Sequence, residues 1–177
     1  MRAIVTGMAV IVSACLLSAC ENKTAGSAAS GSDSTATILA RNKQAALNSD
    51  GGFNKKDVDA VVKDYAADFT EYGNGEYKPQ KNIDSIKINL KSFLAAFPDF
   101  KGENLQAVAQ GDTVIVTGAW SGTFKNEYMG IKPTQKTFKA PEADIFSFNK
   151  EGKITSHRSV QSETTYFLQL GIPIPKK

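Results

Sequence analysis

A chain of 177 residues with 41% hydrophobic residues is long enough for one globular domain with appendages. The net charge is only +3, and the lysines are scattered along the chain rather than clustered. Nucleic-acid-binding proteins normally carry a basic stripe or cluster, so this distribution argues against that class.

The first twenty residues, MRAIVTGMAVIVSACLLSAC, indicate the compartment. Arg2 precedes an apolar run from about Ala3 to Leu17. The run is too short to cross a bilayer comfortably and has the form of a signal peptide. Its end, LSAC, resembles the lipobox of bacterial lipoproteins. The resemblance implies that residues 1–19 are removed and that Cys20 carries the lipid. A transmembrane anchor, or ordinary secretion, is the alternative.

The cysteines support a lipoprotein. Cys15 would leave with the signal peptide and Cys20 would become a thioether, so the mature domain would hold no thiol. Disulfides and cysteine nucleophiles are then excluded, and a single histidine without cysteine argues against a zinc site. No cofactor is expected. Acyl chains would anchor the protein to the membrane. By resemblance to enteric lipoproteins, Glu21 favours the outer membrane, facing the periplasm.

Residues 20–50 are predicted to form a flexible tether after the lipidated cysteine. The stretch ENKTAGSAASGSDSTATILA is rich in small and polar residues and cannot bury enough apolar surface to fold alone. The following TILARNKQAALNSD allows a short helix. The domain is expected to span residues 51–177, with order beginning between Ile38 and Phe53.

Two helices are predicted next. In residues 54–73 apolar side chains recur at three- and four-residue spacings, which indicates one helix with Asn54 as N-cap and Asp57 as its acidic partner. On this helix Asp68 and Glu71 would be solvated charges. A second helix covers NIDSIKINLKSFLAAF and ends at Pro98.

Beyond Pro98 the hydrophobic period becomes two, which is typical of strands. One hairpin covers ENLQAVAQGDTVIVTGAWSGTF, and a second covers QKTFKAPEADIFSFNKEGKITSHRSVQ with a turn at residues 149–152. The segment TTYFLQLGI either closes the sheet or forms a short terminal helix. Helices followed by consecutive antiparallel strands indicate the α+β class.

The motifs FPDF, GDTVIVTGAWSGTF, MGIKPTQKTFKA, DIFSFNKEGKITSHRSV and LQLG follow one another in this order. Together, over about Lys56 to Gly171, the chain resembles the SnoaL-like polyketide cyclase family. The resemblance implies the cone of the nuclear-transport-factor-two-like superfamily. In this fold a curved antiparallel sheet wraps around N-terminal helices and leaves a pocket at the wide end.

The resemblance also implies that the family's catalytic base is absent. In the cyclases the strand after Gly-Lys-Ile reads Glu-His-Trp-Asp, and the aspartate removes a proton from carbon. When the two sequences are aligned on GKI, the family's aspartate corresponds to Ser159. The tryptophan before it corresponds to Arg158, and the family's histidine corresponds to His157. A second acidic position falls on Ser162. Serine is not a base near neutral pH, so chemistry by the family mechanism is not expected.

His157 has three interpretations. An unperturbed pKa of about 6.5 suits a catalytic base, but a pocket-lining histidine and a polar residue on a solvated sheet face are the alternatives. In a strand, His157 shares a face with Ser159 and Gln161. Asp144 lies across the hairpin and is the nearest carboxylate that could orient the imidazole.

The candidate ligand-binding residues combine aromatic side chains with polar groups near His157. They are Tyr65, Phe69, Phe93, Phe97, Trp120, Met129, Asp144, Ser159 and Gln161. The aromatic residues could equally belong to the core, and Met129 could be an exposed loop residue.

Three functions fit these features. The first is an envelope lipoprotein that binds a small hydrophobic molecule in the cone pocket. The second is a cyclase- or isomerase-like enzyme that uses His157. The third is a non-enzymatic module for protein contacts, as a homodimer through the sheet. A deep apolar cavity reached by His157 would favour the first two, and a cavity filled by Trp120, Phe93 and Phe97 would favour the third.

The anchor can be tested with Cys20→Ser, which removes the thiol that would carry the lipid. We expect the variant to lose acylation and to appear in a soluble or unprocessed form. Labelling with palmitate and membrane fractionation measure this. Unchanged labelling and an unchanged membrane fraction would contradict the lipoprotein interpretation.

Overall fold

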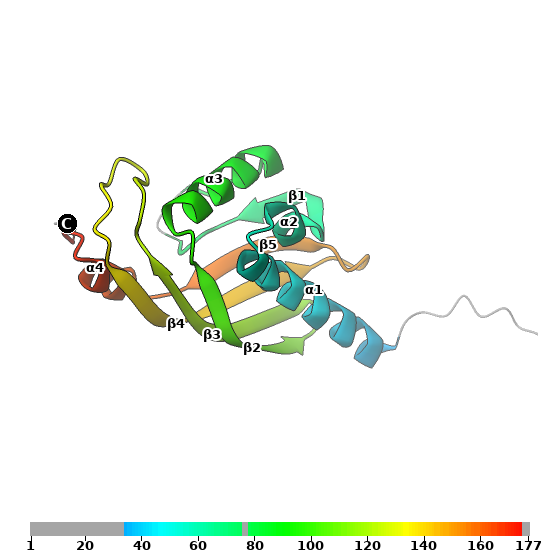
Figure 1. Cartoon of the computed structure of the whole chain (residues 1–177). Helices are drawn as coiled ribbons and strands as arrows, with labels where there is room; N and C mark the ends of the chain where they lie inside the picture. Colours follow the sequence, from blue (N-terminus) through cyan, green and yellow to red (C-terminus); the bar gives the residue numbers. More distant parts are fainter. Residues whose placement is uncertain (1–33, 76–77, 175–177) are drawn as a thin grey trace, which may run out of the picture. The chain divides into compact units, whose positions relative to one another are not determined.

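The computed structural model describes residues 34–75 and 78–174 of the chain. The predicted signal peptide, Cys20 and the first part of the predicted tether lie outside the described residues. Within them the chain forms four helices and five strands (Figure 1). They are α1 (Thr35–Lys55), α2 (Val58–Val62), β1 (Tyr65–Glu71), α3 (Ile83–Ala96), β2 (Lys101–Gln110), β3 (Thr113–Thr123), β4 (Thr137–Phe148), β5 (Ile154–Val160) and α4 (Glu163–Leu170). None of the described helices is long and apolar enough to cross a membrane.

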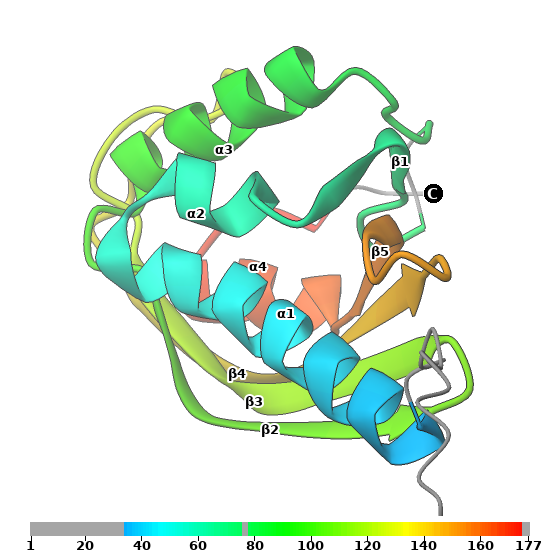
Figure 2. The ribbon, with the colours of Figure 1, turned by 90° about the vertical axis from the view of Figure 1, so that its right-hand side faces the viewer.

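The strands form one sheet in the order β1-β5-β4-β3-β2. From β2 to β5 each strand pairs antiparallel with the next strand in the chain. The β2–β3 and β4–β5 pairs are the two predicted hairpins. At the far edge β1 pairs in parallel with β5. The sheet is curved, and α1, α2 and α3 lie over one of its faces (Figure 2). The predicted α+β class, with a curved sheet wrapped around N-terminal helices, is therefore confirmed.

The single helix predicted over residues 54–73 is wrong, because the segment divides into α2 and strand β1. The N-cap is Asp57, whose side chain accepts a hydrogen bond from the backbone of Ala60 at 3.0 Å. Asn54 is the penultimate residue of α1 instead. The misassignment has a simple cause: a spacing of four residues, as between Tyr65 and Phe69, repeats on one face of both a helix and a strand.

The predicted tether is also too long. Helix α1 begins at Thr35, after Ser34 as N-cap, and runs to Lys55. Ala45 and Ala46 on this helix are 8% and 0% exposed and belong to the core. The small side chains of this segment offer little apolar surface to bury, which is typical of a tether. The same small side chains also allow a helix to approach the sheet closely. Regular structure is therefore already present at Thr35, well before residue 51.

The other two helices follow the sequence pattern. Helix α3 begins after the N-cap Asn82, whose side chain accepts from the backbone of Ser85 at 2.8 Å, and it ends before Pro98. The terminal segment forms helix α4, so the sheet is not closed by a further strand. Ser162, at the second acidic position of the family, is the N-cap of α4.

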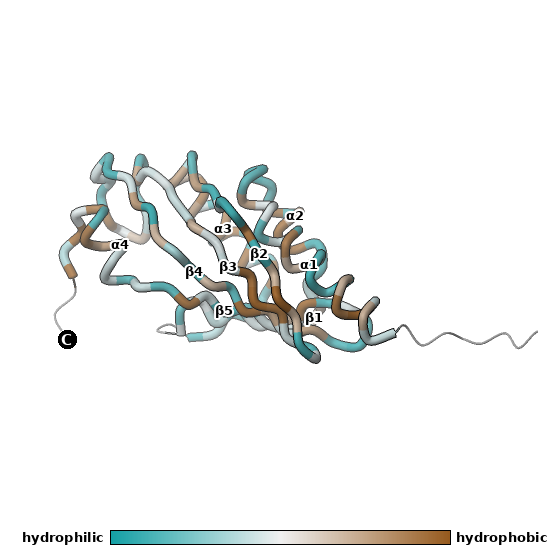
Figure 3. Tube along the Cα trace, turned by 90° about the horizontal axis from the view of Figure 1, so that it is seen from below, coloured by the Kyte–Doolittle hydropathy of each residue, from teal (hydrophilic) through white to brown (hydrophobic). Residues whose placement is uncertain are grey.

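Two groups of buried residues form the core. The first joins α1, β1, α3 and the turn-side ends of β3, β4 and β5. Its members are Ala45, Ala46, Phe69, Ile86, Val114, Val116, Phe146, Phe148 and Ile154. The second joins α2, α3, α4, the opposite ends of β3 and β4, and residues that directly follow α3 and β3. Its members are Val58, Leu94, Ala96, Phe97, Phe100, Trp120, Phe124, Phe138 and Leu170. Figure 3 shows the hydrophobic parts of β2 and β3 side by side along the sheet.

Two adjacent glycines of α1 test how closely α1 and α2 pack. A Cβ added to Gly52 would lie 2.7 Å from Val61 Cγ2 and 2.8 Å from Val61 N, whereas a Cβ on Gly51 meets nothing within 4 Å. We expect Gly52→Ala to lower the free energy of unfolding by about 1–3 kcal/mol. Gly51→Ala should raise it by about 0.5–1 kcal/mol, because alanine favours the helix. Denaturant melts of both variants measure the difference, and equal effects would contradict the close contact.

Candidate functional site

A cavity of about 430 Å³ opens between the helices and the inner face of the sheet. This volume lies within the range that holds a drug-sized molecule. Most of its wall is aromatic or aliphatic. The aromatic members are Phe53, Tyr65, Phe93, Phe97, Phe100, Trp120, Phe124, Tyr128, Phe138, Phe146, Tyr166 and Phe167.

The rings of this wall hold one another in place. Phe100 stacks on Trp120 with centroids 4.9 Å apart, and Phe93 meets Phe100 edge-on at 4.8 Å. Phe97 stacks on Phe124 at 5.1 Å. Such pairs add stability beyond the burial of their area. The rings of the wall therefore support one another through direct contacts.

At the other end of the cavity, His157 lies between two carboxylates from the flanking strands. Its Nδ1 is 2.9 Å from both carboxylate oxygens of Glu71 on β1, and its Nε2 is 3.0 Å from Asp144 Oδ1 on β4. The side chain of Asp144 is 6% exposed and that of His157 is 17% exposed. A carboxylate only accepts hydrogen bonds, so both ring nitrogens must donate and the ring carries a positive charge.

The charge state of His157 follows from its neighbours. Burial alone would lower the pKa of His157, but the negative charge of Glu71 and the hydrogen bonds with Asp144 and Glu71 raise this pKa well above its usual value. Neither ring nitrogen is free. To act as the predicted catalytic base, His157 would first have to give up one of these hydrogen bonds and its proton.

Three further acids line the same cavity: Glu142, Asp50 and Glu163. Glu142 precedes Asp144 by two residues on β4, and its Oε2 accepts a 2.7 Å hydrogen bond from the hydroxyl of Tyr166 on α4. Burial and the charge of Asp144 raise the pKa of Glu142 to about 7. Asp50 on α1 is 2% exposed, and burial and the charge of Asp144 raise its pKa well above the usual value. Among the described residues, Asp50 Oδ2 has no hydrogen-bond partner.

Eight of the nine predicted ligand-binding residues line this cavity. They are Tyr65, Phe93, Phe97, Trp120, Met129, Asp144, Ser159 and Gln161. Met129 belongs to the loop between β3 and β4 and is 73% exposed. Phe69 is the exception, because it is fully buried and belongs to the core, where it stacks under Tyr65 with centroids 3.8 Å apart.

The polar residues of the site that sequence reasoning missed include the acids Glu71, Asp50 and Glu142. Glu71 was assigned to the solvated side of a helix, yet on β1 it pairs across the ladder with His157. Asp50 was placed in the tether, and Glu142 was not singled out. The alternation on β4 carries a signal for Glu142, because Glu142 shares its face with Asp144 and with the buried Phe146. In the described part of the chain, no group of side chains is arranged to hold a metal ion.

Comparison with known proteins gives the family. Residues 43–170 match the family model described as SnoaL-like polyketide cyclase. A search of the curated proteins finds no match. Several solved structures are similar. A candidate SnoaL-like polyketide cyclase from Jannaschia sp. CCS1 superposes with a TM-score of 0.70 at 15% identity, over 81% of this chain and 100% of that one.

Two further structures agree. A candidate polyketide cyclase from Xanthomonas campestris pv. campestris has a TM-score of 0.69 at 16% identity, over 75% of this chain and 98% of that one. AclR, a candidate hydroxylase from Streptomyces galilaeus, has a TM-score of 0.65 at 24% identity, over 78% of this chain and 90% of that one. At these identities the likeness establishes the fold alone. The family model spans most of the chain, and the protein therefore belongs to the SnoaL-like polyketide cyclase family.

Proposed function

We propose that this SnoaL-family protein binds a small, largely apolar molecule in its cavity, while a lipid on Cys20 holds it at the outer membrane, facing the periplasm. The observation that carries the binding proposal is the open cavity of about 430 Å³, which joins an aromatic wall to the buried group around His157. The anchor is supported by the LSAC motif and by the apolar run before it.

The cavity favours binding over a purely structural role. If the cone only supported protein contacts, Trp120, Phe93 and Phe97 would be expected to fill its interior. These three side chains instead stand in the wall and leave a drug-sized space. Buried groups with shifted pKa values, such as Glu142 and Asp50, also gather at functional sites more often than elsewhere. Pairing of two copies through the sheet stays a prediction.

Helix α3 offers a matched pair of variants to test binding. Leu90 lines the cavity, whereas Ile88 on the same helix is 66% exposed. Leu90→Trp should fill part of the cavity and weaken binding of N-phenyl-1-naphthylamine, an apolar fluorescent probe that is uncharged at neutral pH, by about tenfold or more. Ile88→Trp should leave the affinity unchanged. Fluorescence titration measures both, and equal affinities for the two variants would contradict binding in this cavity.

Acid–base catalysis is a second candidate function, and Glu142 is the observation that favours it. A general base works best when its pKa lies near the working pH, and the pKa of Glu142 is about 7. The strand register adds a geometric argument. Asp144 is the cross-strand partner of Ser159, the position where the family's base is missing. The acids of β4 thus border the place where the cyclases keep their carboxylate.

A generic proton-abstraction substrate tests this chemistry. With 5-nitrobenzisoxazole, a carboxylate removes the ring proton, the N–O bond breaks and a cyanophenolate is released. Because only ionised Glu142 can accept the proton, the rate should rise with pH through a midpoint of about 7. Glu142→Gln should lower it by about 10²-fold or more. Glu151→Gln, in the exposed turn before β5, is the control. A Glu142→Gln rate equal to that of the control would exclude Glu142 as the base.

A further inference from the structure

We propose that the ligand is a cation: its protonated amine lies among the acids of the cavity, and its apolar body lies against the aromatic wall. This inference rests on the proposed binding function and adds the chemical class of the ligand. It depends on the charges that line the cavity, on one unsatisfied carboxyl group, and on the nature of the wall.

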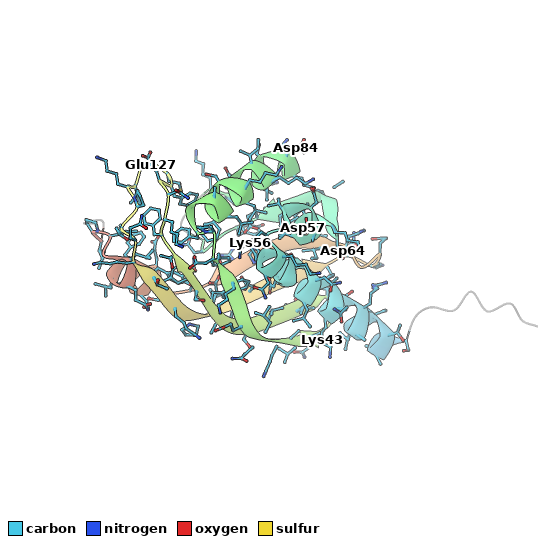
Figure 4. All side chains as sticks on the ribbon, in the orientation of Figure 1. Lys43, Lys56, Asp57, Asp64, Asp84 and Glu127 are labelled. Carbon is cyan, nitrogen blue, oxygen red and sulfur yellow. The ribbon has the colours of Figure 1, made fainter. Side chains whose placement is uncertain are left out.

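The cavity lining is acidic, whereas the chain as a whole has a small positive charge. The chain carries 21 lysines and arginines and has a net charge of +3. Among the described residues that line the cavity there is no lysine or arginine, and the acids are Asp50, Glu71, Glu142, Asp144 and Glu163. The basic side chains lie elsewhere: Lys43 and Lys56, labelled in Figure 4, belong to α1 and its C-terminal cap. A concave site of one sign attracts molecules of the opposite sign.

His157 does not balance these acids. Its two nitrogens are taken by Glu71 and Asp144, so its positive charge is shared between those two carboxylates. Among the described residues, Asp50 and Glu142 have no cation within ion-pair distance. Asp50 is 2% exposed and its Oδ2 lacks a hydrogen-bond partner. A buried carboxyl group without a partner is costly, and an ammonium group would supply both the charge and the missing donors.

The aromatic wall suits the rest of such a molecule. Cations are attracted to the faces of aromatic rings as well as to carboxylates. The rings of Phe93, Phe100, Trp120 and Tyr128 line the same cavity as Asp50. An anionic ligand of the same shape would meet only repulsion from the acids. A neutral one would leave Asp50 without a charged partner.

Binding of a cation has a proton signature. The groups that face Glu142 are Asp50 from α1, Asp144 on β4, His157 from β5 and Tyr166 from α4. A bound ammonium would lower the raised pKa values of Glu142 and Asp50, because a positive charge favours their ionised forms. The acids should therefore release protons when an amine binds near neutral pH. Affinity for the amine should rise between about pH 6 and 8, because over this range Glu142 becomes ionised even before the amine binds.

Three naphthalene derivatives of the same shape separate the charge classes: 1-naphthylmethylamine, 1-naphthylmethanol and 1-naphthoic acid. The whole protein in phosphatidylcholine vesicles is titrated calorimetrically with each, against empty vesicles as blank. We expect the amine to bind about tenfold or more tighter than the alcohol, and the acid to bind most weakly. Repeating the amine titration in buffers of different ionisation enthalpy measures the protons released.

Near-isosteric variants locate the effect. Glu142→Gln and Asp50→Asn should each reduce the affinity for the amine by several-fold and by much more than the affinity for the alcohol, while Glu151→Gln should change neither. Thermal melts check that each variant is folded. If the alcohol or the acid binds as tightly as the amine, the cation assignment is overturned and the binding proposal stands. If none of the three compounds binds, and N-phenyl-1-naphthylamine does not bind either, the binding proposal fails and this inference with it.

Discussion

The interior of this domain depends on one charged histidine. Three strands, β1, β5 and β4, each contribute one residue to the Glu71–His157–Asp144 bridge, and the hydrogen bonds on both sides of the ring are about 3 Å long. Two carboxylates could not remain buried this close together without a positive charge between them. Removing one partner from such a buried group typically costs about 3–5 kcal/mol, because it leaves the other charge uncompensated. The bridge thus links the edge strand β1 to the sheet through side chains. Its charges also determine the electrostatic environment of the neighbouring acids.

The two ends of the cavity are supported by different interactions. Stacked rings such as Phe100 and Trp120 support the apolar end through contact area and ring geometry. At the polar end, directional hydrogen bonds define the positions of the side chains. Helix α1 connects the two, because its small residues bring it close enough to the core for Asp50 to reach the acids of β4. A bulkier helix would have kept this carboxyl group in solvent.

The sequence predicted the class, both hairpins and the second helix, residues 82–97. These segments have turn residues or caps at their ends and a single hydrophobic period between them. The prediction failed where the helical and strand periods give the same spacing. Tyr65 and Phe69 fit a helix and a strand equally. Because this segment was assigned to a helix, Glu71 was not recognised as a partner of His157. Asp144 could be found from the hairpin register alone. Asp50 could not, because its place depends on how α1 packs on the sheet, which no local pattern encodes.

The position of Trp120 has a practical consequence. It is the only tryptophan in the chain, its side chain is 3% exposed, and it stands in the cavity wall, stacked on Phe100. Indole emission depends on the polarity and contacts of its surroundings. A ligand that packs against the wall would change the surroundings of this ring. The native protein thus carries its own optical reporter of occupancy, and an unlabelled sample can be screened for ligands by its intrinsic fluorescence.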